Sequence, residues 1–129
     1  MKIVIQTIKH TDQDYKTVGN YGVDEDGTQW IKVSDMGNED YNFLVALHEL
    51  IEQKLAHKRG ISGESITTFD TTFEEAREKY PNIFGDTEPG SHPKAPYHQE
   101  HEYAMRIEAS MAQELGVDWQ EYNKAVNDL

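Results

Sequence analysis

Residues 38–60 have the sequence NEDYNFLVALHELIEQKLAHKRG and carry the strongest helical signal in the chain. Asn38 is a good N-cap, acidic residues follow it in the first turn, and Gly60 ends a last turn that is rich in basic residues. The sequence therefore predicts a long helix here. At about 100° per residue, its apolar side chains form one stripe. The stripe contains Leu44, Leu47, Ile51 and Leu55.

Segments rich in β-branched and aromatic residues precede this helix. They predict strands at residues 2–9, 15–23 and 28–33. Between the last two, Asp26 and Gly27 supply the positive φ that a tight hairpin needs. Because strands come first and helices follow, the pattern favours an α+β fold with N-terminal antiparallel strands and three to four helices.

Further helices are expected in the second half of the chain. A capping-box pattern that starts at Thr71, together with Pro81 after Tyr80, predicts a short helix at residues 71–80. Residues 97–115 form another helix, for which Pro96 is suited to the first position. Two further features are a short terminal helix after Asp118 and a proline loop at residues 81–96, which holds all four prolines.

The composition describes one acidic domain. The 129 residues include 24 Asp and Glu against 12 Lys and Arg, a net charge of -12, and form a strand region (1–36) and a helical region (38–129). Such a surface repels phosphate backbones and anionic lipid, so neither nucleic acid nor a membrane is an expected partner. Without a long apolar run or a signal-peptide pattern, we expect a cytoplasmic protein. Because there is no cysteine, any metal must be held by His, Asp, Glu or carbonyl groups.

Polar residues interrupt the apolar stripe of the first helix. His48 falls inside the stripe and Glu52 lies at its edge, one turn further on, so both can reach one point in space. Residues 48–52 form an HExxE motif, one residue away from the HExxH of zinc metallohydrolases, in which the Glu after the first His is the general base. Glu49 occupies that position here and is the candidate catalytic residue.

The helix at 97–115 shows the same anomaly, because His101 and Glu108 lie within its apolar face. A buried carboxylate needs a partner, and the shared explanation is a metal held by His48, Glu52 and His101. Two His and one carboxylate suit Zn²⁺, with Fe²⁺ and Mn²⁺ as alternatives. Glu108 lies about 10.5 Å from His101 along the helix axis, too far for the two to bind one ion together. We therefore expect Glu108 to accept a hydrogen bond from a ligand, or to pair with a Lys or Arg.

Two further residues are candidate ligands of lower rank. His98 lies one turn before His101, and Asp70 lies just before the expected helix at 71–80. For Asp70, capping that helix is the favoured interpretation. A buried His–Glu network without a metal is the competing explanation for the whole cluster.

Several segments resemble a group of small proteins, without an assigned activity, from phage and prophage genomes. The segments are HELIE (48–52), FD (69–70), EPGSHPKAPYHQEH (88–101), RIE (106–108) and ELGVDWQEY (114–122). This resemblance implies a phage or mobile-element setting, hence the host-cell cytoplasm. It also associates His48, Glu49, Glu52, Asp70, His98, Glu100 and His101. The first helix additionally resembles the active-site helix of zincins, with Glu52 at the place of the second His.

The sequence therefore predicts a metal-binding protein with a zincin-like site and, as its chemistry, metal-assisted hydrolysis with Glu49 as base. Its substrate is not indicated. One alternative is a non-enzymatic acidic protein that binds and inhibits a basic host protein. Another is a magnesium-dependent nucleoside-phosphate hydrolase that uses Glu49 and Glu52 as an ExxE pair.

Overall fold

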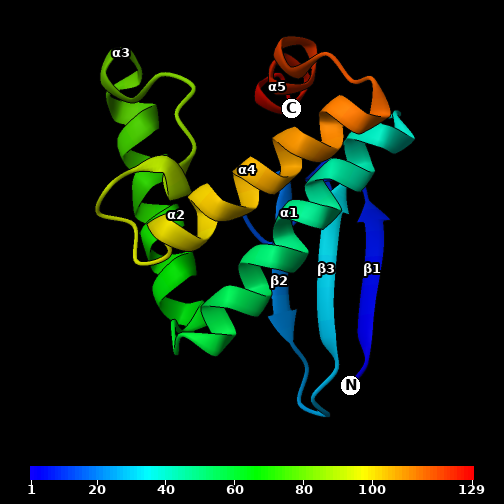
Figure 1. Cartoon of the computed structure of the whole chain (residues 1–129). Coiled ribbons are helices and arrows are strands. Elements are labelled where there is room, and N and C mark those ends of the chain that lie inside the picture. The colour runs from blue at the N-terminus through cyan, green and yellow to red at the C-terminus, as the bar shows by residue number, and fades with distance from the viewer.

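The computed structural model describes all 129 residues and has an α+β architecture, as the sequence predicts. Three strands form one sheet in the order β1-β3-β2. They are β1 (Ile3–Ile8), β2 (Gly19–Val23) and β3 (Gln29–Ser34). The helices follow along the chain and pack on and beside this sheet (Figure 1).

The strand pairing differs from the prediction at β1. β2 and β3 form the expected antiparallel hairpin, with Gly27 at a φ of 86° in its turn. β1, however, runs parallel to β3, with Ile5 opposite Ile31. The predicted antiparallel pairing is therefore confirmed for the hairpin and was wrong for β1. β1 and β3 both run opposite to β2, which lies between them in the chain, so they are parallel where the order β1-β3-β2 places them side by side.

The second strand is also shorter than predicted. Residues 9–18 hold a short turn of helix, η1 (His10–Asp12), and an irregular segment, so β2 begins only at Gly19. The side-chain amide of Gln13 donates to the backbone carbonyls of Val18 and Lys32, at 3.4 and 3.2 Å. These side-chain bonds tie the irregular segment to the end of the β2–β3 pair.

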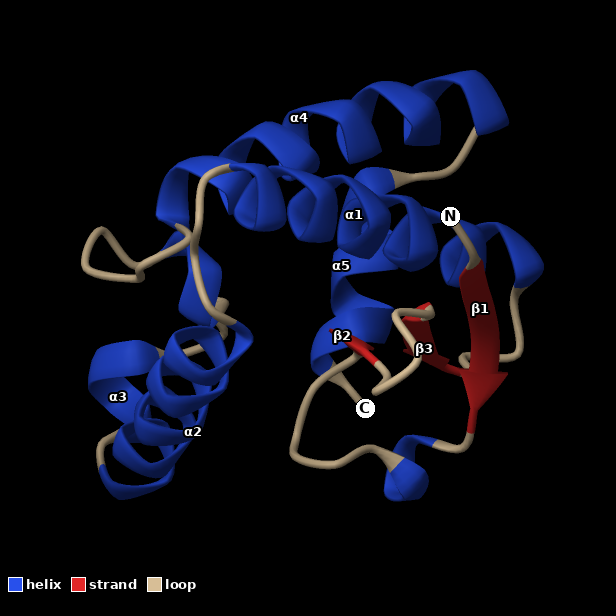
Figure 2. Ribbon diagram, turned by 90° about the horizontal axis from the view of Figure 1, so that it is seen from below, coloured by secondary structure: helices blue, strands red, loops and turns tan.

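Two long helices build the layers that carry the site. α1 (Glu39–Lys58) lies across β2 and β3, and α4 (His98–Leu115) packs on another side of α1. Sheet, α1 and α4 thus form three successive layers (Figure 2). The Asn38 side chain accepts a hydrogen bond from the Tyr41 amide, which confirms the predicted N-cap. Ile31, Val33 and Leu44 fill the core between sheet and helix.

The buried face of α1 is wider than the predicted stripe and is rotated from it. Because α1 is covered both by the sheet and by α4, two of its sides are buried. Leu47 and Ile51 are only partly buried, and Phe43 remains 48% exposed. The fully buried residues are Leu44, Val45, Ala46, His48, Glu52, Gln53 and Ala56.

α2 (Gly63–Lys79) starts earlier than predicted. Ser62 is its N-cap and accepts a hydrogen bond from the Ser65 amide, so the predicted start at Thr71 was wrong. The threonine-rich sequence before Thr71 has a low helix propensity. Tertiary packing overrides it, since Ile66 and Phe73 lie two turns apart on one face and are both buried.

The proline loop contains two short helical turns, α3 (Pro81–Phe84) and η2 (Pro89–Ser91). Its end differs slightly from the prediction, because Tyr97, and not Pro96, directly precedes the first residue of α4. Pro96 therefore lies outside the helix.

The C-terminal helix α5 (Trp119–Asn127) returns toward α1 and α4. Asp118 caps it by accepting a hydrogen bond from the Glu121 amide, as predicted. Its Tyr122 is 1% exposed and points into the core. None of the helices is long and apolar enough to cross a membrane.

Candidate metal centre

Three buried side chains from α1 and α4 meet at one point, and they are the three that the sequence singles out. The facing atoms are His48 Nε2, Glu52 Oε2 and His101 Nδ1. Both nitrogens lie 3.0 Å from the carboxylate oxygen and 3.1 Å from each other. Zinc bonds of about 2.0–2.1 Å place tetrahedral ligands about 3.3 Å apart. A widening of a few tenths of an ångström would therefore admit an ion.

In each histidine, the ring nitrogen that faces away from Glu52 contacts a second carboxylate. His48 Nδ1 lies 2.6 Å from Glu108 Oε1, and His101 Nε2 lies 3.0 Å from Glu88 Oε2. Because a carboxylate only accepts, the nitrogen on this side donates, and a neutral ring then has its lone pair on the opposite nitrogen. In both rings that opposite nitrogen faces Glu52. Carboxylate–histidine pairs of this kind orient the ligands of metal sites.

Two tyrosines hold the carboxylates in turn. The Tyr21 hydroxyl donates to Glu52 Oε1 at 3.0 Å, which leaves Oε2 for the histidines. The Tyr122 hydroxyl donates to Glu108 Oε2 at 2.6 Å. Glu108 therefore lies behind His48, and not beside a Lys or Arg, which was the other partner the sequence left open.

The cluster is strongly coupled in its charges. Burial by itself lowers the pKa of His48, but hydrogen bonds with Glu108 and Glu52 raise it well above 6.5. Burial acts in the same way on His101, yet Glu52 and Glu88 raise its pKa to about 9. Burial by itself raises the pKa of Glu52, whereas hydrogen bonds from both histidines lower it to about 2. Without an ion, the protonated imidazoles therefore supply the positive charge that faces Glu52.

Glu49 lines the same pocket from the neighbouring side of α1 and is partly buried. Its side chain lies against the backbone of Gly19 so closely that a Cβ there would come within 2.7 Å of Glu49 Cγ. Burial and the charge of Glu52 raise the pKa of Glu49 to about 8. Its carboxyl group thus titrates near neutral pH beside the proposed ligands.

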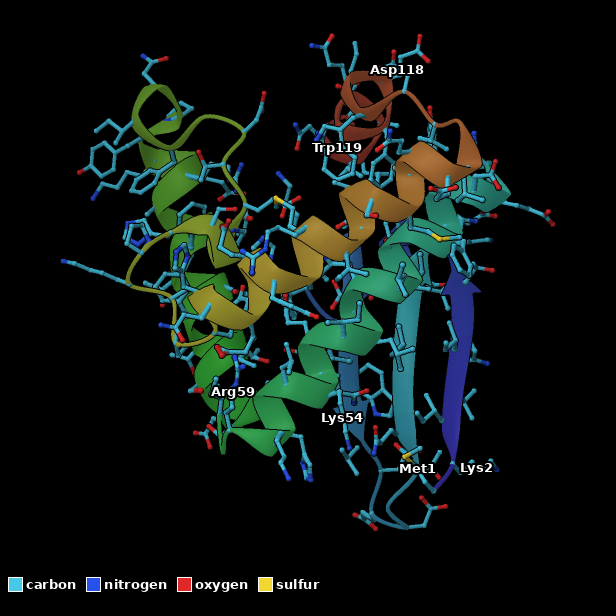
Figure 3. The ribbon with its side chains drawn as sticks, in the orientation of Figure 1. Met1, Lys2, Lys54, Arg59, Asp118 and Trp119 are labelled. Atoms are coloured by element: carbon cyan, nitrogen blue, oxygen red, sulfur yellow. The ribbon has the colours of Figure 1, made fainter.

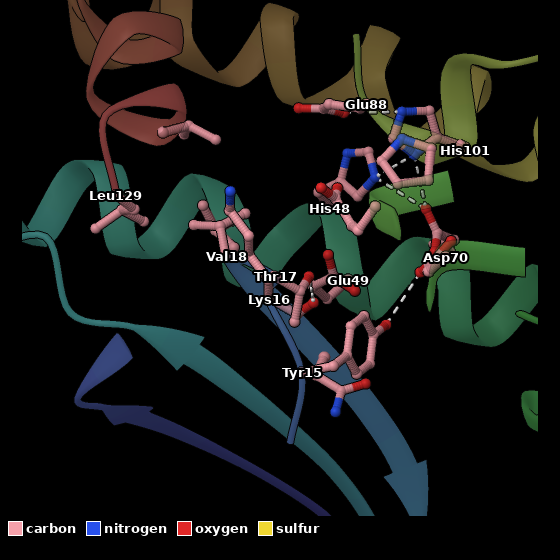
Figure 4. Close-up of a pocket in the computed structure, with 18 of the residues that line it drawn as sticks. Tyr15, Lys16, Thr17, Val18, His48, Glu49, Asp70, Glu88, His101 and Leu129 are labelled. Atoms are coloured by element: carbon pink, nitrogen blue, oxygen red, sulfur yellow. Dashed lines mark hydrogen bonds and ion pairs between the residues drawn. The ribbon is translucent and has the colours of Figure 1, made fainter. Parts of the chain in front are cut away.

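The pocket around these residues has a volume of about 240 Å³. His48 and His101 lie on one side of it, and Glu49 and Tyr15 lie further along α1 and the adjoining loop (Figure 4). Among its charged residues carboxylates outnumber cations, since Lys16 and Arg77 are its only Lys or Arg side chains. The pocket is therefore an acidic cleft that adjoins the three candidate ligands.

Asp70 lines the pocket but does not belong to the three-ligand cluster. It lies inside α2, so the favoured interpretation as a helix cap was wrong. Its carboxylate accepts hydrogen bonds from the hydroxyls of Tyr15, at 3.0 Å, and Tyr97. Burial raises its pKa to about 6. Asp70 thus ties α2 to the loop before β2 and to the start of α4.

The structure does not bring His98 into the cluster. Its Nδ1 lies 2.9 Å from the Gly90 carbonyl, so the side chain braces the proline loop. Gly90 itself lies directly against His101, because a Cβ on Gly90 would come within 2.4 Å of His101 Cγ. The proline loop therefore packs directly against the candidate ligand His101. Glu100, which the phage resemblance associates with the motif, pairs instead with Arg59 at 2.6 Å.

Several residues of the site have no counterpart in the sequence predictions. Tyr21 comes from a strand, Glu88 from the proline loop and Tyr122 from α5. A weak signal existed for Tyr122, because it falls on the apolar side of an amphipathic helix. Glu88 lies in a segment without periodicity, and its one signal is that it opens the segment 88–101 of the phage resemblance.

Comparisons of this chain with protein-family models, with curated proteins and with solved structures find no match.

Proposed function

We propose that this protein binds one divalent metal ion, zinc in the first instance, through His48, Glu52 and His101. The observation that carries this proposal is the carboxylate behind each histidine, Glu108 for His48 and Glu88 for His101. A buried network that served only stability would not need both rings turned with a nitrogen toward the same oxygen of Glu52. The chemistry of this donor set, two imidazoles and one carboxylate, is that of catalytic zinc sites.

The acidic cleft beside the ligands supports metal-assisted hydrolysis as the activity. When bound, an ion with three protein ligands lowers the pKa of a water and polarises a carbonyl oxygen. Glu49 is the group of this chain that would take the proton, since it lines the cleft and its pKa of about 8 lies close to the working range of a general base. A nearby cation would lower that pKa and favour the ionised form at neutral pH.

The lining of the cleft disfavours a nucleoside phosphate as substrate. Of its two permanent cations, Arg77 is paired with Glu74 at 3.1 Å, which leaves Lys16. Glu52 faces the two histidines, so it does not form with Glu49 the paired carboxylates that a magnesium–phosphate site needs. An uncharged amide, peptide or ester bond fits such an acidic cleft better.

The metal site is tested by elemental analysis of protein purified without added metal, and by zinc titration of the metal-free protein. We expect about one ion per chain, and His101→Ala should abolish its binding. His92→Ala is the matched control, because His92 packs near the rings of Phe69 and Phe73 and lies outside the cluster. A chelator should lower the melting temperature of the wild type, since a ligand at 100 times its Kd stabilises by about 2.7 kcal/mol. Wild-type protein that binds no ion would overturn the proposal.

The hydrolytic activity is tested separately with Glu49→Gln. This variant should keep the fold and the metal, because Glu49 is neither a ligand nor part of the core. It should lose about 10²–10⁴-fold in turnover of peptide, amide or ester substrates, the usual worth of a general base. If the metal-loaded wild type turns over none of these, the metal has a structural role.

A further inference from the structure

One side of α1 carries apolar residues that the fold does not cover. Phe43 is 48% exposed, and Leu47 and Ile51, which follow it at intervals of four residues, are only partly buried. On a helix, Leu47 and Glu49 point in nearly opposite directions, since they are two residues apart. This apolar strip therefore lies on the side of α1 that faces away from the acidic cleft.

Charged residues are placed symmetrically at the two ends of this strip. Asp40 lies seven residues before Leu47, and Lys54 lies seven residues after it. Seven residues are close to two helical turns, so both charges are on the same side of α1 as Leu47. Both are exposed, and Lys54 lies toward the C-terminal end of the helix (Figure 3). The strip thus runs from acidic through apolar to basic.

We propose that this strip is the interface with a second copy of the chain, with the two α1 helices antiparallel and the twofold axis at Leu47. Phe43 then lies opposite Ile51 of the second copy, because both are four residues from Leu47. Asp40 likewise lies opposite Lys54 of the second copy. A parallel pairing would set Asp40 against Asp40 and Lys54 against Lys54, which is unfavourable.

The charge of the whole protein makes this local complementarity necessary. Each chain carries a net charge of -12, so two copies repel each other at long range. A surface on which opposite charges meet across an apolar centre offsets that repulsion at one place and in one orientation. The order of charges along α1 complements itself, which favours a second copy over an unrelated partner.

The neighbouring elements supply the additional area that a dimer needs. A helix of 20 residues is about 30 Å long, and its exposed strip alone offers a few hundred Å², below the roughly 800 Å² per partner of a standard interface. Exposed apolar residues also occur on α4, which packs on α1, and on β1, at the edge of the sheet beyond β3: Ile107 is 36% exposed and Ile5 is 48% exposed. Both contribute to the proposed interface.

The test is sedimentation equilibrium of the full chain at concentrations from about 1 to about 100 µM, a range that resolves micromolar dimerisation. The wild type should reach twice the mass of 14.8 kDa. Asp40→Lys and Lys54→Asp should each raise the dimer Kd by at least about tenfold, and the double variant should restore it. Ile83→Glu is the control, since Ile83 is 74% exposed on α3 and should leave dimerisation unchanged.

Asp40 and Lys54 are both exposed, so these changes leave the core intact, which a thermal melt of each variant will verify. A wild type that is monomeric throughout the concentration range would overturn the proposal. So would a dimer that both single variants leave unchanged, because it would use another surface. Failure of the double variant to restore the dimer would exclude the antiparallel pairing.

Discussion

Replacing Glu108 by Gln removes one negative charge from the centre of the protein without changing its volume. The Glu108 carboxylate is 8% exposed and lies 2.6 Å from both His48 Nδ1 and the Tyr122 hydroxyl. A glutamine has one acceptor oxygen and an NH₂ group that only donates. The single oxygen can accept from only one of the two present donors; if it accepts from His48 Nδ1, the NH₂ group donates to the Tyr122 oxygen and the Tyr122 O–H loses its acceptor.

The expected loss of stability follows from these two contacts. A charge-assisted hydrogen bond contributes about 1.5–3 kcal/mol, and a buried donor without an acceptor costs about 1–3 kcal/mol. The metal-free Glu108→Gln protein should thus unfold with about 3 kcal/mol less free energy than the wild type. For a chain of this size, that lowers Tm by roughly 10 °C. Zinc affinity should fall about 10–100-fold, because the carboxylate that orients and polarises His48 becomes an uncharged amide.

The assay combines urea unfolding in the presence of a chelator with zinc titration against a competing chromogenic chelator. Tyr122→Phe is the matched control, since it removes one hydrogen bond from Glu108 but keeps the charge that faces His48. It should cost about 1.5–3 kcal/mol, because this hydrogen bond is charge-assisted, and leave zinc affinity unchanged. If Glu108→Gln binds zinc as tightly as Tyr122→Phe and the wild type, Glu108 does not position His48.

Three further changes test other parts of the site. The raised pKa of His101 stabilises the metal-free fold below about pH 6.5, and this contribution is lost as pH rises through about 9. Urea unfolding in the presence of a chelator should therefore show the free energy of unfolding falling over that window. Calorimetry in buffers of different ionisation enthalpy should show that zinc binding releases protons. Gly90→Ala should cost about 1–3 kcal/mol of stability and weaken zinc binding, because its Cβ would collide with the His101 ring. Gly63→Ala, the control, should be neutral or stabilising by up to about 1 kcal/mol. Denaturant unfolding measures the stability of both variants, and zinc titration measures their affinity. Asp70→Asn should lower the melting temperature while zinc affinity persists, since Asp70 binds two tyrosine hydroxyls and is not a ligand; lost zinc binding in a folded variant would contradict this assignment.

The elements that the sequence predicts best are those with local signals at both ends. α1 begins at the N-cap Asn38, and α4 ends at Gly116, whose φ of 69° is the left-handed conformation expected of a C-cap glycine. The parallel pairing of β1 with β3 has no such signal, because it depends on which edge of β3 the hairpin partner leaves free. The first half of α2 was missed for a related reason, since tertiary contacts of Ile66 outweigh the low helix propensity of its threonines.

The same distinction explains which site residues were found. His48 and His101 interrupt apolar stripes with a helical period, so a departure from a regular pattern marks them. Glu88 and Tyr21 reach the site from a loop and from a strand, where no period exists to depart from. Their positions depend on how the proline loop folds over α4 and how the sheet packs under α1, and neither is encoded locally.

The placement of these polar groups sets the relation between fold and function. Eight of the 23 buried residues are polar or charged, and the most buried side of α1 carries His48 and Glu52 while the apolar Phe43 stays exposed. Buried ion pairs are often no more stabilising than apolar residues of the same volume, so stability alone does not explain this arrangement. An ion that replaces the imidazole protons would relieve the repulsion between two cationic rings whose facing nitrogens lie 3.1 Å apart, and it would keep the hydrogen bonds with Glu108 and Glu88. In the metal-free chain, the positive charge at the centre of the domain thus comes from protonation of the two imidazoles.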